Sequence, residues 1–442
     1  MNNLTPQQRA ALHLTLFPLP TYSSESDDDF AALAVAAAST RATQIPNGWW
    51  ENEVPEMTDA EFKSHFRLAR ASFTALSASI TQQWIKPRRR GRAPMPAAKA
   101  LAMTLWRLAN TTTFREVGRQ FGILRATAFK IVARMLKMLI AQHGHIIRLP
   151  SNATEWNSAR THFAPYTSFH NTVGAIDGSH IRLIYPPKRN RSHFQNRKKF
   201  PSIVMQAIVN HRALYMDVAV GAEGSMHDAF VWVRSDASDT IPSTIPPHHY
   251  LVGDSAYPAS PFLLTPFKSQ LTAQEMRYNK SLSSTRVVVE LTFGQTKCRW
   301  RCLNGVRTKD IDNADLYALV SCILHNWLSL NNDGVLLEWM ETQSKLQEAL
   351  NLQLQQAGII PAVDEDRPTL MELYQHHLQQ QPQQGPAPQP PAPVHAPHLH
   401  VQLDAARQTL FNQYFTNGAQ SVSASNITDI GLHLRDQIAA TY

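Results

Sequence analysis

Five short runs rich in β-branched residues follow one another between residues 173 and 253. They cover residues 173–176, 181–185, 203–209, 214–220 and 250–253. Helical spacing appears near 227–235 and dominates from 283 to 330. Strands that first follow one another and then alternate with helices are typical of an α/β layer with a mixed sheet. This order predicts an α/β domain whose mixed sheet is flanked by helices.

Three carboxylates interrupt or end these apolar runs. Asp177 and Asp254 each follow a strand-like run and stand beside glycine, so we expect them at the rim of the sheet. Glu290 lies within an apolar stretch of the helical segment 283–301. Ionised carboxylates avoid apolar surroundings unless they are paired or bound to metal. A structural ion pair would explain each acid singly, whereas the three together favour one shared site.

Carboxylate oxygens are hard ligands that suit Mg²⁺ in octahedral geometry. Two such ions about 3.5–4 Å apart stabilise the attacking and the leaving oxygen of a phosphoryl displacement. We therefore predict that Asp177, Asp254 and Glu290 are catalytic and metal-binding residues. The predicted cofactor is a divalent cation, Mg²⁺ or Mn²⁺, with two ions in the site.

Basic residues concentrate in the middle of the chain. The formal net charge is +8, but residues 61–330 hold 36 basic and 15 acidic side chains. Both ends are acidic, with two basic and eight acidic side chains in 1–60 and four and eleven in 331–442. Such an excess in a compact region indicates a polyanionic partner, and nucleic acid is the usual one. A merely basic soluble domain is the alternative.

A helical region precedes the strand-like runs. Apolar spacing predicts helices over 57–85, 97–109, 114–121 and 125–140, with a tight turn over 122–124. Two short helices joined by such a turn are typical of a helix-turn-helix. A plain helical bundle has the same periodicity and stays open as the alternative. The predicted DNA contacts of the last helix are Arg125, Lys130, Arg134 and Lys137.

A second basic cluster follows the residues around Asp177. It is interleaved with Phe194 and Phe200, which favours a groove for the DNA backbone over a solvated hairpin. Its predicted DNA contacts are Lys188, Arg189, Arg191, Arg197, Lys198 and Lys199. Another basic run, 86–92, predicts an exposed loop that is either a nuclear-import signal, a phosphate clamp or a solvated linker.

Two charged residues are candidates to support the carboxylates. Asp228 either supports the metal site as a neighbour of its ligands or caps the helix that follows, and we prefer capping. Arg286 lies one helical turn before Glu290. It either orients that carboxylate, contacts phosphate, or forms a simple pair along the helix.

The cysteines suggest neither a disulfide scaffold nor a metal site. Cys298, Cys302 and Cys322 are too few and too clustered for a scaffold, so a reducing compartment fits better. Zinc binding by these cysteines with His325 is disfavoured because structural zinc sites use shorter cysteine spacing, and we expect His325 to be a core or a capping histidine. No apolar run approaches the roughly 18–20 residues of a membrane helix, so we expect no membrane partner. The first twenty residues show no secretory signal.

The motifs around the three acids resemble the nuclease domain of the PIF/Harbinger transposase family. They read Ala-Ile-Asp-Gly-Ser-His-Ile at 175–181, Gly-Ser-Met-His-Asp at 224–228 and Gly-Asp-Ser-Ala-Tyr-Pro at 253–258. A longer match covers 286–297, and Leu-His-Asn at 324–326 is similar to the family's terminal helix signature. The resemblance implies an RNase H-like fold whose triad, here Asp177, Asp254 and Glu290, binds two divalent metals. It also implies a separate Myb/SANT-like DNA-binding partner that assists nuclear entry.

We therefore expect four parts: an acidic flexible tail over 1–55, a helical, helix-turn-helix-like DNA-binding region over 56–150, an RNase H-like DDE nuclease domain over 165–330, and a helical and Gln/Pro-rich, largely disordered tail over 331–442. The expected function is metal-dependent DNA cleavage, with strand transfer by a freed 3′-hydroxyl. The alternatives are a domesticated, catalytically silent DNA-binding or assembly protein and a chromatin adaptor. We expect the protein in the nucleus, with some in the cytoplasm, and leave a homo-oligomer open.

Overall fold

The computed structural model describes residues 48–84, 95–187, 190–268, 271–308, 311–336, 338–342, 344, 345, 348 and 375. The described residues fall into two compact units, a first unit up to residue 144 and a second unit from residue 145 onward. Several predictions lie outside the described residues: most of the acidic tail, the basic run 86–92, the DNA contacts Lys188 and Arg189, and nearly all of the Gln/Pro-rich tail. None of the described helices is both long and apolar enough to cross a bilayer.

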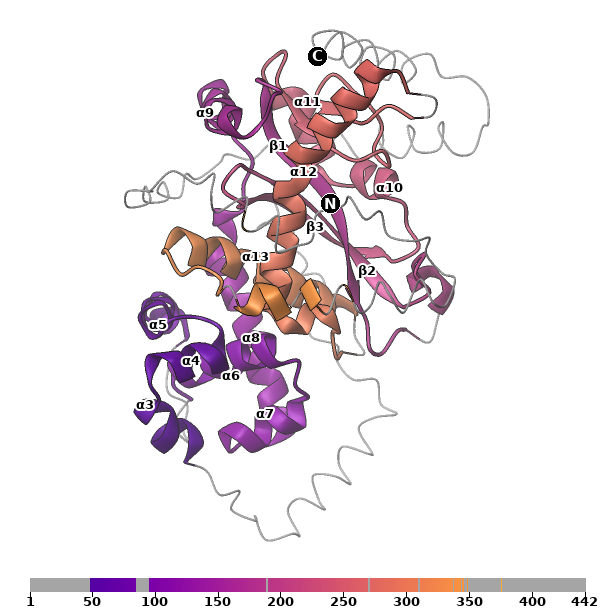
Figure 1. Ribbon diagram of the computed structural model, residues 1–442. Helices are drawn as coiled ribbons and strands as arrows, with labels where there is room; N and C mark the ends of the chain where they lie inside the picture. Colours follow the sequence, from indigo (N-terminus) through magenta and orange to yellow (C-terminus); the bar gives the residue numbers. More distant parts are fainter. Residues whose placement is uncertain are drawn as a thin grey trace, which may run out of the picture. The chain divides into compact units, whose positions relative to one another are not determined.

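The described part of the first unit is helical (Figure 1). Its elements are η1 (Trp49–Glu53), α3 (Val54–Glu56), α4 (Asp59–Phe66), α5 (Arg70–Trp84), α6 (Ala97–Asn110), α7 (Phe114–Phe121) and α8 (Arg125–His143). Helices α6, α7 and α8 coincide with predicted helices, and α8 continues slightly further than expected. Gly122 ends α7 with a φ of 70°, in the left-handed region that glycine adopts readily. The turn is therefore as predicted, whereas a DNA-binding role for these helices stays a prediction.

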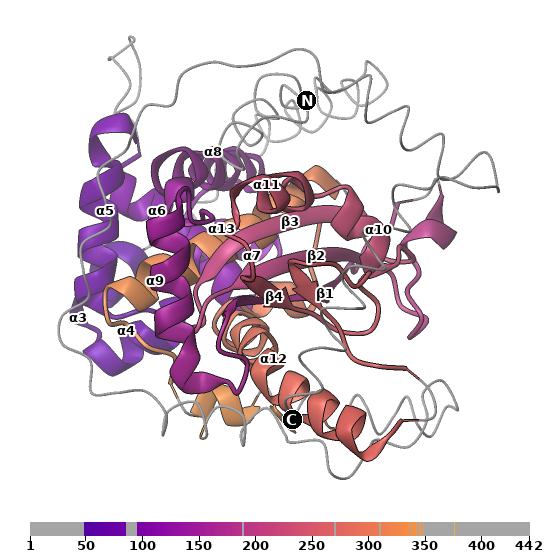
Figure 2. The same cartoon turned by 90° about the horizontal axis from the view of Figure 1, so that it is seen from above.

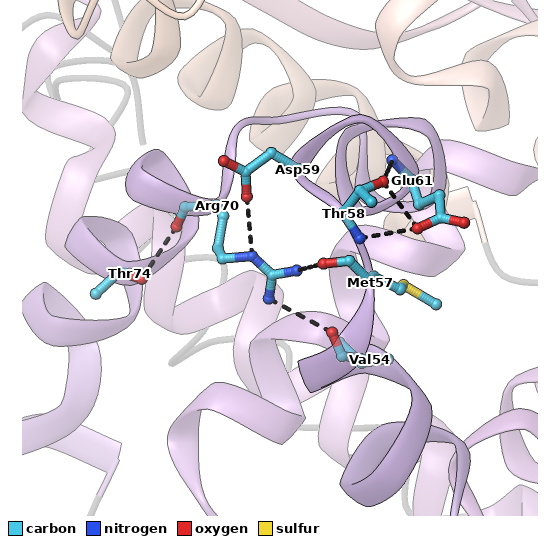
Figure 3. A network of polar contacts seen from close by, with 7 residues as sticks. All are labelled: Val54, Met57, Thr58, Asp59, Glu61, Arg70 and Thr74. Atoms are coloured by element: carbon cyan, nitrogen blue, oxygen red, sulfur yellow. Dashed lines mark hydrogen bonds and ion pairs between the residues drawn. The ribbon is translucent and has the colours of Figure 1, made fainter.

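Short-range polar contacts fix the helix ends of this unit. Thr58 Oγ1 accepts a hydrogen bond from the Glu61 amide at 3.2 Å, and the Glu61 carboxylate accepts one from the Thr58 amide at 2.8 Å. This reciprocal capping satisfies amides that the first helical turn leaves without partners. Figure 3 shows how Arg70 adds to it, donating to Asp59 Oδ1 at 3.1 Å and to the Met57 carbonyl at 2.5 Å. The start of α5 is thereby tied to the segment that leads into α4.

The second unit contains strands and helices. After η2 (Gly144–Ile146) its elements are α9 (Ala153–Phe163), η3 (Ala164–Tyr166), β1 (Thr172–Arg182), η4 (Arg191–Phe194), β2 (Ser202–Val209), β3 (Tyr215–Glu223), α10 (Asp228–Val233), α11 (Asp236–Thr244), β4 (Tyr250–Val252), β5 (Leu263–Leu264), α12 (Ala273–Arg299), η5 (Arg301–Asn304) and α13 (Ile311–Leu330). The predicted mixed α/β fold with helices flanking a sheet is confirmed.

The five strands lie in the order β3-β2-β1-β4-β5. β1 pairs antiparallel with β2, and β2 pairs antiparallel with β3, whereas β1–β4 and β4–β5 are parallel. The pairing of β1 with β2 extends to Arg182, but its pairing with β4 ends at Ala175. β1 therefore continues well past the end of β4, and side chains from elsewhere reach this stretch of its edge.

The prediction of two short strands around an Asp-Gly pair was wrong. β1 is one strand from Thr172 to Arg182, so Asp177 lies within the sheet rather than at its rim. Gly178 stays in the strand and pairs with Gln206 of β2. A side chain at Gly178 would not fit, because its Cβ would lie 2.4 Å from Asp228 Oδ1. Glycine here allows close approach of a carboxylate rather than a turn.

Helices cover both faces of the sheet (Figure 2). On one face, Trp232 of α10 and Ile241 of α11 pack with Ile176 and Ile208 of the sheet, and all four are buried. Successive residues of a strand point to opposite faces. Asp177 therefore points to the other face, where α12 packs against β1. The sheet holds this carboxylate between its own surface and α12.

Candidate active site

Three carboxylates from distant parts of the chain approach one arginine. Asp177 lies in β1, Asp254 follows β4, and Glu290 lies in α12. Arg286 Nη2 donates to Asp177 Oδ2 at 2.9 Å and to Glu290 Oε1 at 3.2 Å. Asp254 is close enough to act electrostatically on both Asp177 and Arg286. The structure therefore brings the predicted acids to a common place.

The site has more negative charge than its arginine balances. Burial raises the pKa of Asp177 to about 6; Arg286 opposes this shift, while the negative charges of Glu290 and Asp254 add to it. Burial alone would lower the pKa of Arg286, but attraction by Asp177, Glu290 and Asp254 raises it. A carboxyl whose ionised form is disfavoured despite an adjacent guanidinium indicates a functional site.

Local structure positions each of these side chains. Asp177 Oδ1 accepts a hydrogen bond from the Gly178 amide at 2.8 Å. Asp254 Oδ1 accepts one from the Ala256 amide, also at 2.8 Å, in the loop after β4. Residues four apart share a helix face, which places Arg286 beside Glu290. The prediction of a simple helix pair is therefore too narrow, because the same guanidinium also reaches Asp177 in β1.

Asp228 adds a fourth carboxylate beside the site. It does not cap α10 as we preferred, because His227 is the N-cap residue and no side chain caps this helix. Its Oδ1 lies instead against Gly178. The pKa of Asp228 is raised by burial and by the charge of Asp254, and Arg197 opposes that shift. The alternative, support of the metal ligands, stays a prediction.

The oxygen atoms of Asp177, Asp254 and Glu290 are chemically suited to a divalent cation, although Arg286 forms ion pairs with two of these residues. Across the described residues, no three His, Cys, Asp or Glu side chains form a group that could hold a metal ion. Arg286 lies between Asp177 and Glu290 in this arrangement. Carboxylate oxygens with excess negative charge are nevertheless the ligands that Mg²⁺ and Mn²⁺ prefer. The three carboxylates therefore suit the predicted metal if the guanidinium moves out from between Asp177 and Glu290.

The basic side chains of α8 differ in their surroundings. Arg125 and Lys130 are exposed, and Lys137 is half-buried. The guanidinium of Arg134 lies 4.0 Å from the centre of the Trp84 ring and donates to the Trp84 carbonyl at 2.7 Å. Arg134 thus packs within its own unit, which is a structural role that the DNA-contact prediction did not anticipate.

The basic cluster near β1 lies next to the carboxylates. Arg197 acts electrostatically on Asp228, and Lys198 acts on Lys297 of α12. Two other predicted DNA contacts of this loop, Arg191 and Lys199, are exposed. Sequence reasoning missed Lys297 as a neighbour of the site. The signal was its spacing, since it follows Glu290 by seven residues and therefore lies on the same helix face.

The three cysteines lie in the interior of the structure. Cys298, Cys302 and Cys322 are free and buried. His325 is buried as well, and its Nε2 forms a hydrogen bond with the Ala213 carbonyl at 2.8 Å, which confirms its expected place in the core. The sulfur of Cys298 contacts that of Met340, and the sulfur of Cys322 contacts that of Met205.

Comparisons with known proteins relate this part of the chain to one family and to a set of relatives. Residues 176–326 match the family described as DDE superfamily endonuclease, a stretch that contains all three acids. The Rattus norvegicus protein named "Putative nuclease HARBI1" is 26% identical over 277 residues, which cover 62% of this chain and 79% of that protein. The Arabidopsis thaliana protein named "Protein ALP1-like" is 26% identical over 304 residues, covering 63% and 74%. No solved structure gives a significant match.

The fold, the acids and these matches define a class of protein. Residues 176–326 match the family described as DDE superfamily endonuclease, and the chain is similar to proteins named as nucleases. The recognition of a Harbinger-derived chain is confirmed by the relatives that it matches. Family and relatives together support a nuclease of transposase ancestry.

Proposed function

We propose that this protein is a divalent-metal-dependent DNA endonuclease that cleaves phosphodiester bonds, with strand transfer as a further reaction. The observation that carries the proposal is the approach of Asp177, Asp254 and Glu290 to one guanidinium within a segment of the DDE superfamily. The strand order β3-β2-β1-β4-β5, antiparallel up to β1 and parallel beyond it, supports an RNase H-like fold.

In the proposed mechanism, Asp177, Asp254 and Glu290 hold two Mg²⁺ or Mn²⁺ ions, with Asp228 supporting the arrangement. When bound, the metal ions activate water and stabilise the charge that develops on the phosphate. Arg286 keeps Asp177 and Glu290 together in the metal-free protein, where their like charges would otherwise repel. Arg286 contacts the same carboxylates that would hold the metal. Metal binding would therefore release its guanidinium to contact the phosphate of the substrate.

DNA is the proposed substrate, because residues 61–330 hold 36 basic against 15 acidic side chains and Arg125 and Lys130 are exposed on α8. A Myb/SANT-like partner and a nuclear location are proposed from the family resemblance. Binding of DNA through a helix-turn-helix over α7 and α8 is proposed from the turn that joins these helices.

A catalytically silent DNA-binding or assembly protein is the second candidate. The observation that favours it is Arg286, whose guanidinium lies between two of the three acids where a cation would otherwise bind. A silent protein would keep this arrangement permanently, since a buried carboxylate pair needs a positive neighbour.

Nicking of supercoiled plasmid by the purified full chain, with Mg²⁺ or Mn²⁺, tests the proposal. We expect cleavage by the wild type and loss to background for Asp177→Asn, Asp254→Asn and Glu290→Gln. Asp239→Asn, which neutralises an exposed acid of α11, is the matched control and should cleave as the wild type does. DNA binding without cleavage, equal in the wild type and the triad variants, would instead establish the silent protein.

A further inference from the structure

One polar side chain interrupts the apolar strand β2. Residues 203–209 read Ile-Val-Met-Gln-Ala-Ile-Val, so Gln206 is the polar member of an otherwise apolar run. Gln206 is 1% exposed. Burying an amide is unfavourable unless its oxygen and its nitrogen are both hydrogen-bonded, whereas methionine fills a similar volume without that cost. Packing alone therefore does not account for glutamine at this position.

Only one end of the Gln206 amide is hydrogen-bonded. Tyr257, which follows Asp254 by three residues, donates from its hydroxyl to Gln206 Oε1 at 3.3 Å. Gln206 Nε2 is buried and has no hydrogen-bond partner among the residues that the structure describes. An unpaired buried donor lowers stability, and native structures retain such groups rarely. The NH₂ group of Gln206 is therefore available to a further acceptor.

The Asp228 carboxylate lies next to this amide. Gln206 of β2 pairs with Gly178 of β1. Side chains at directly opposed positions of two antiparallel strands lie on the same face of the sheet, with their Cβ atoms about 4.5–5.5 Å apart. Asp228 Oδ1 lies 2.4 Å from the point that a Cβ at Gly178 would occupy. A carboxylate oxygen of Asp228 therefore takes the cross-strand place opposite the side chain of Gln206.

The surrounding charges favour one orientation of the amide. Burial raises the pKa of Tyr257 well above its usual value, and the negative charges of Asp177, Asp228 and Asp254 raise it further. The hydroxyl therefore keeps its proton and acts as the donor to Gln206 Oε1. The same negative charges favour an amide whose oxygen faces the hydroxyl and whose NH₂ group faces the carboxylates. Tyr257 thereby determines which end of Gln206 is presented to the acids.

The loop after β4 fixes the position of the Tyr257 hydroxyl. The Tyr257 amide donates to the Asp254 carbonyl at 3.3 Å. The ring of Tyr257 is buried and lies so close to Gly253 that a Cβ there would be 3.2 Å from it. The hydrogen bond between Tyr257 and Gln206 therefore connects β2 with the loop that carries Asp254.

We propose that Gln206 is a positioning residue for Asp228: in the metal-loaded protein its Nε2 donates to the Asp228 carboxylate, and the Tyr257 hydroxyl holds the amide in this orientation. A carboxylate that accepts a hydrogen bond from a fixed donor keeps one orientation, and metal sites supported in this way bind their ions more tightly. The inference rests on the proposed function in one respect, namely that the acids bind a divalent metal. Gln206 and Tyr257 act through Asp228 rather than by contact with the metal.

The test combines two measurements on the full chain without DNA: Mn²⁺ affinity by isothermal titration calorimetry, and urea unfolding in chelator. Gln206→Met keeps the side-chain volume but has no donor, and it should weaken Mn²⁺ binding about tenfold. In chelator this variant should unfold at the same or a higher urea concentration than the wild type, because it removes an unpaired buried donor. A purely structural Gln206 predicts the opposite pattern, namely a lower unfolding midpoint with unchanged Mn²⁺ affinity.

Two further variants test the link through the hydroxyl. Tyr257→Phe should also weaken Mn²⁺ binding, but should have no further effect in a chain that already carries Gln206→Met, because the hydroxyl acts through the amide. Tyr278→Phe is the matched control. It removes another buried hydroxyl, which donates to the Thr265 carbonyl at 3.5 Å, and it should keep the wild-type Mn²⁺ affinity.

Wild-type Mn²⁺ affinity in Gln206→Met, or additive losses from Gln206→Met and Tyr257→Phe, would overturn the proposal and leave the endonuclease in place. Where Gln206→Met fails to fold, Tyr257→Phe decides on the same measurement by comparison with Tyr278→Phe. The expected losses of affinity, in a protein whose wild type does not nick plasmid, would reject the endonuclease and keep the positioning role. A wild type that binds no Mn²⁺ would reject both.

Discussion

Two arginines, one in each unit, join segments of the chain in contrasting ways. Arg70 contacts Asp59 and the carbonyls of Val54 and Met57, all within 16 residues of it in the sequence. Its side chain is 32% exposed and that of Asp59 84% exposed. Arg286 joins residues 109 apart in sequence, and its exposed fraction is 13% against 15% for Asp177.

The contrast separates stability from function. The partners of Arg70 are mostly carbonyl oxygens of neighbouring turns, so the contact fixes local backbone at small electrostatic cost. Arg286 instead binds two carboxylates that repel each other, and their proximity does not stabilise the fold. Ionisable groups that the fold keeps in an unfavourable charge state are typical of sites that bind a ligand or catalyse a reaction.

The largest expected effect is that of Arg286→Met. Removing one partner of a buried ion pair leaves Asp177 and Glu290 without compensation, and should lower the free energy of unfolding by about 3–5 kcal/mol in chelator. Millimolar Mg²⁺ should restore more stability to this variant than to the wild type, because a bound cation replaces the guanidinium. Urea unfolding with and without Mg²⁺ measures both. A loss as small as that of an Arg70 variant, with no effect of Mg²⁺, would refute the assignment.

Acid should destabilise the second unit next most strongly. The pKa of His325 falls from 6.5 to about 4 on burial. Between these values the unfolded chain binds the proton and the folded chain does not, so stability is full above pH 6.5 and falls as the pH drops towards 4. The loss from this group is on the order of 3 kcal/mol. His325→Gln, which keeps a donor for the Ala213 carbonyl but does not titrate, should show a shallower pH dependence in urea unfolding; an identical slope would exclude His325 as the cause.

Arg70→Met should cost the first unit about 1–2 kcal/mol, since it removes charged hydrogen bonds to carbonyls near the surface. Hydrogen exchange of amides in α4 and α5 measures this locally, apart from the second unit. If Arg70→Met lowers the free energy of unfolding as much as Arg286→Met does, the contrast between the two arginines is wrong.

The smallest expected effect is that of Asp59→Asn. This change removes only an exposed ion pair with Arg70, and such pairs contribute less than about 1 kcal/mol. Thermal unfolding at low and high salt should show a difference from the wild type only at low salt. A larger, salt-independent loss would mean that Asp59 has a structural role beyond the ion pair.

Local signals in the sequence predicted much of the secondary structure. Apolar spacing and Gly122 placed α7 and α8, and β-rich runs placed β2 and β3. The Thr-x-x-Glu pattern that begins at Thr58, and again at Thr272 before α12, was present and marks the helix starts. These features depend on residues close in sequence, so the sequence is enough to reveal them.

These local signals did not predict the contacts between segments that are distant in the sequence. Glycine after Asp177 suggested a turn, whereas it provides space for Asp228, which lies far along the chain. Family motifs identified the three acids, but not that Arg286 reaches Asp177 or that Lys297 reaches Ser179. Sheet register and the path of α12 decide those contacts, and neither is set by local spacing.

Anomalous diffraction from crystals soaked in Mn²⁺ tests the central claim most directly. The account predicts peaks within coordination distance of carboxylate oxygens of Asp177, Asp254 and Glu290, with the Arg286 guanidinium withdrawn from between Asp177 and Glu290. Crystals that bind Mn²⁺ only elsewhere, and in which Arg286 keeps both contacts, would contradict it.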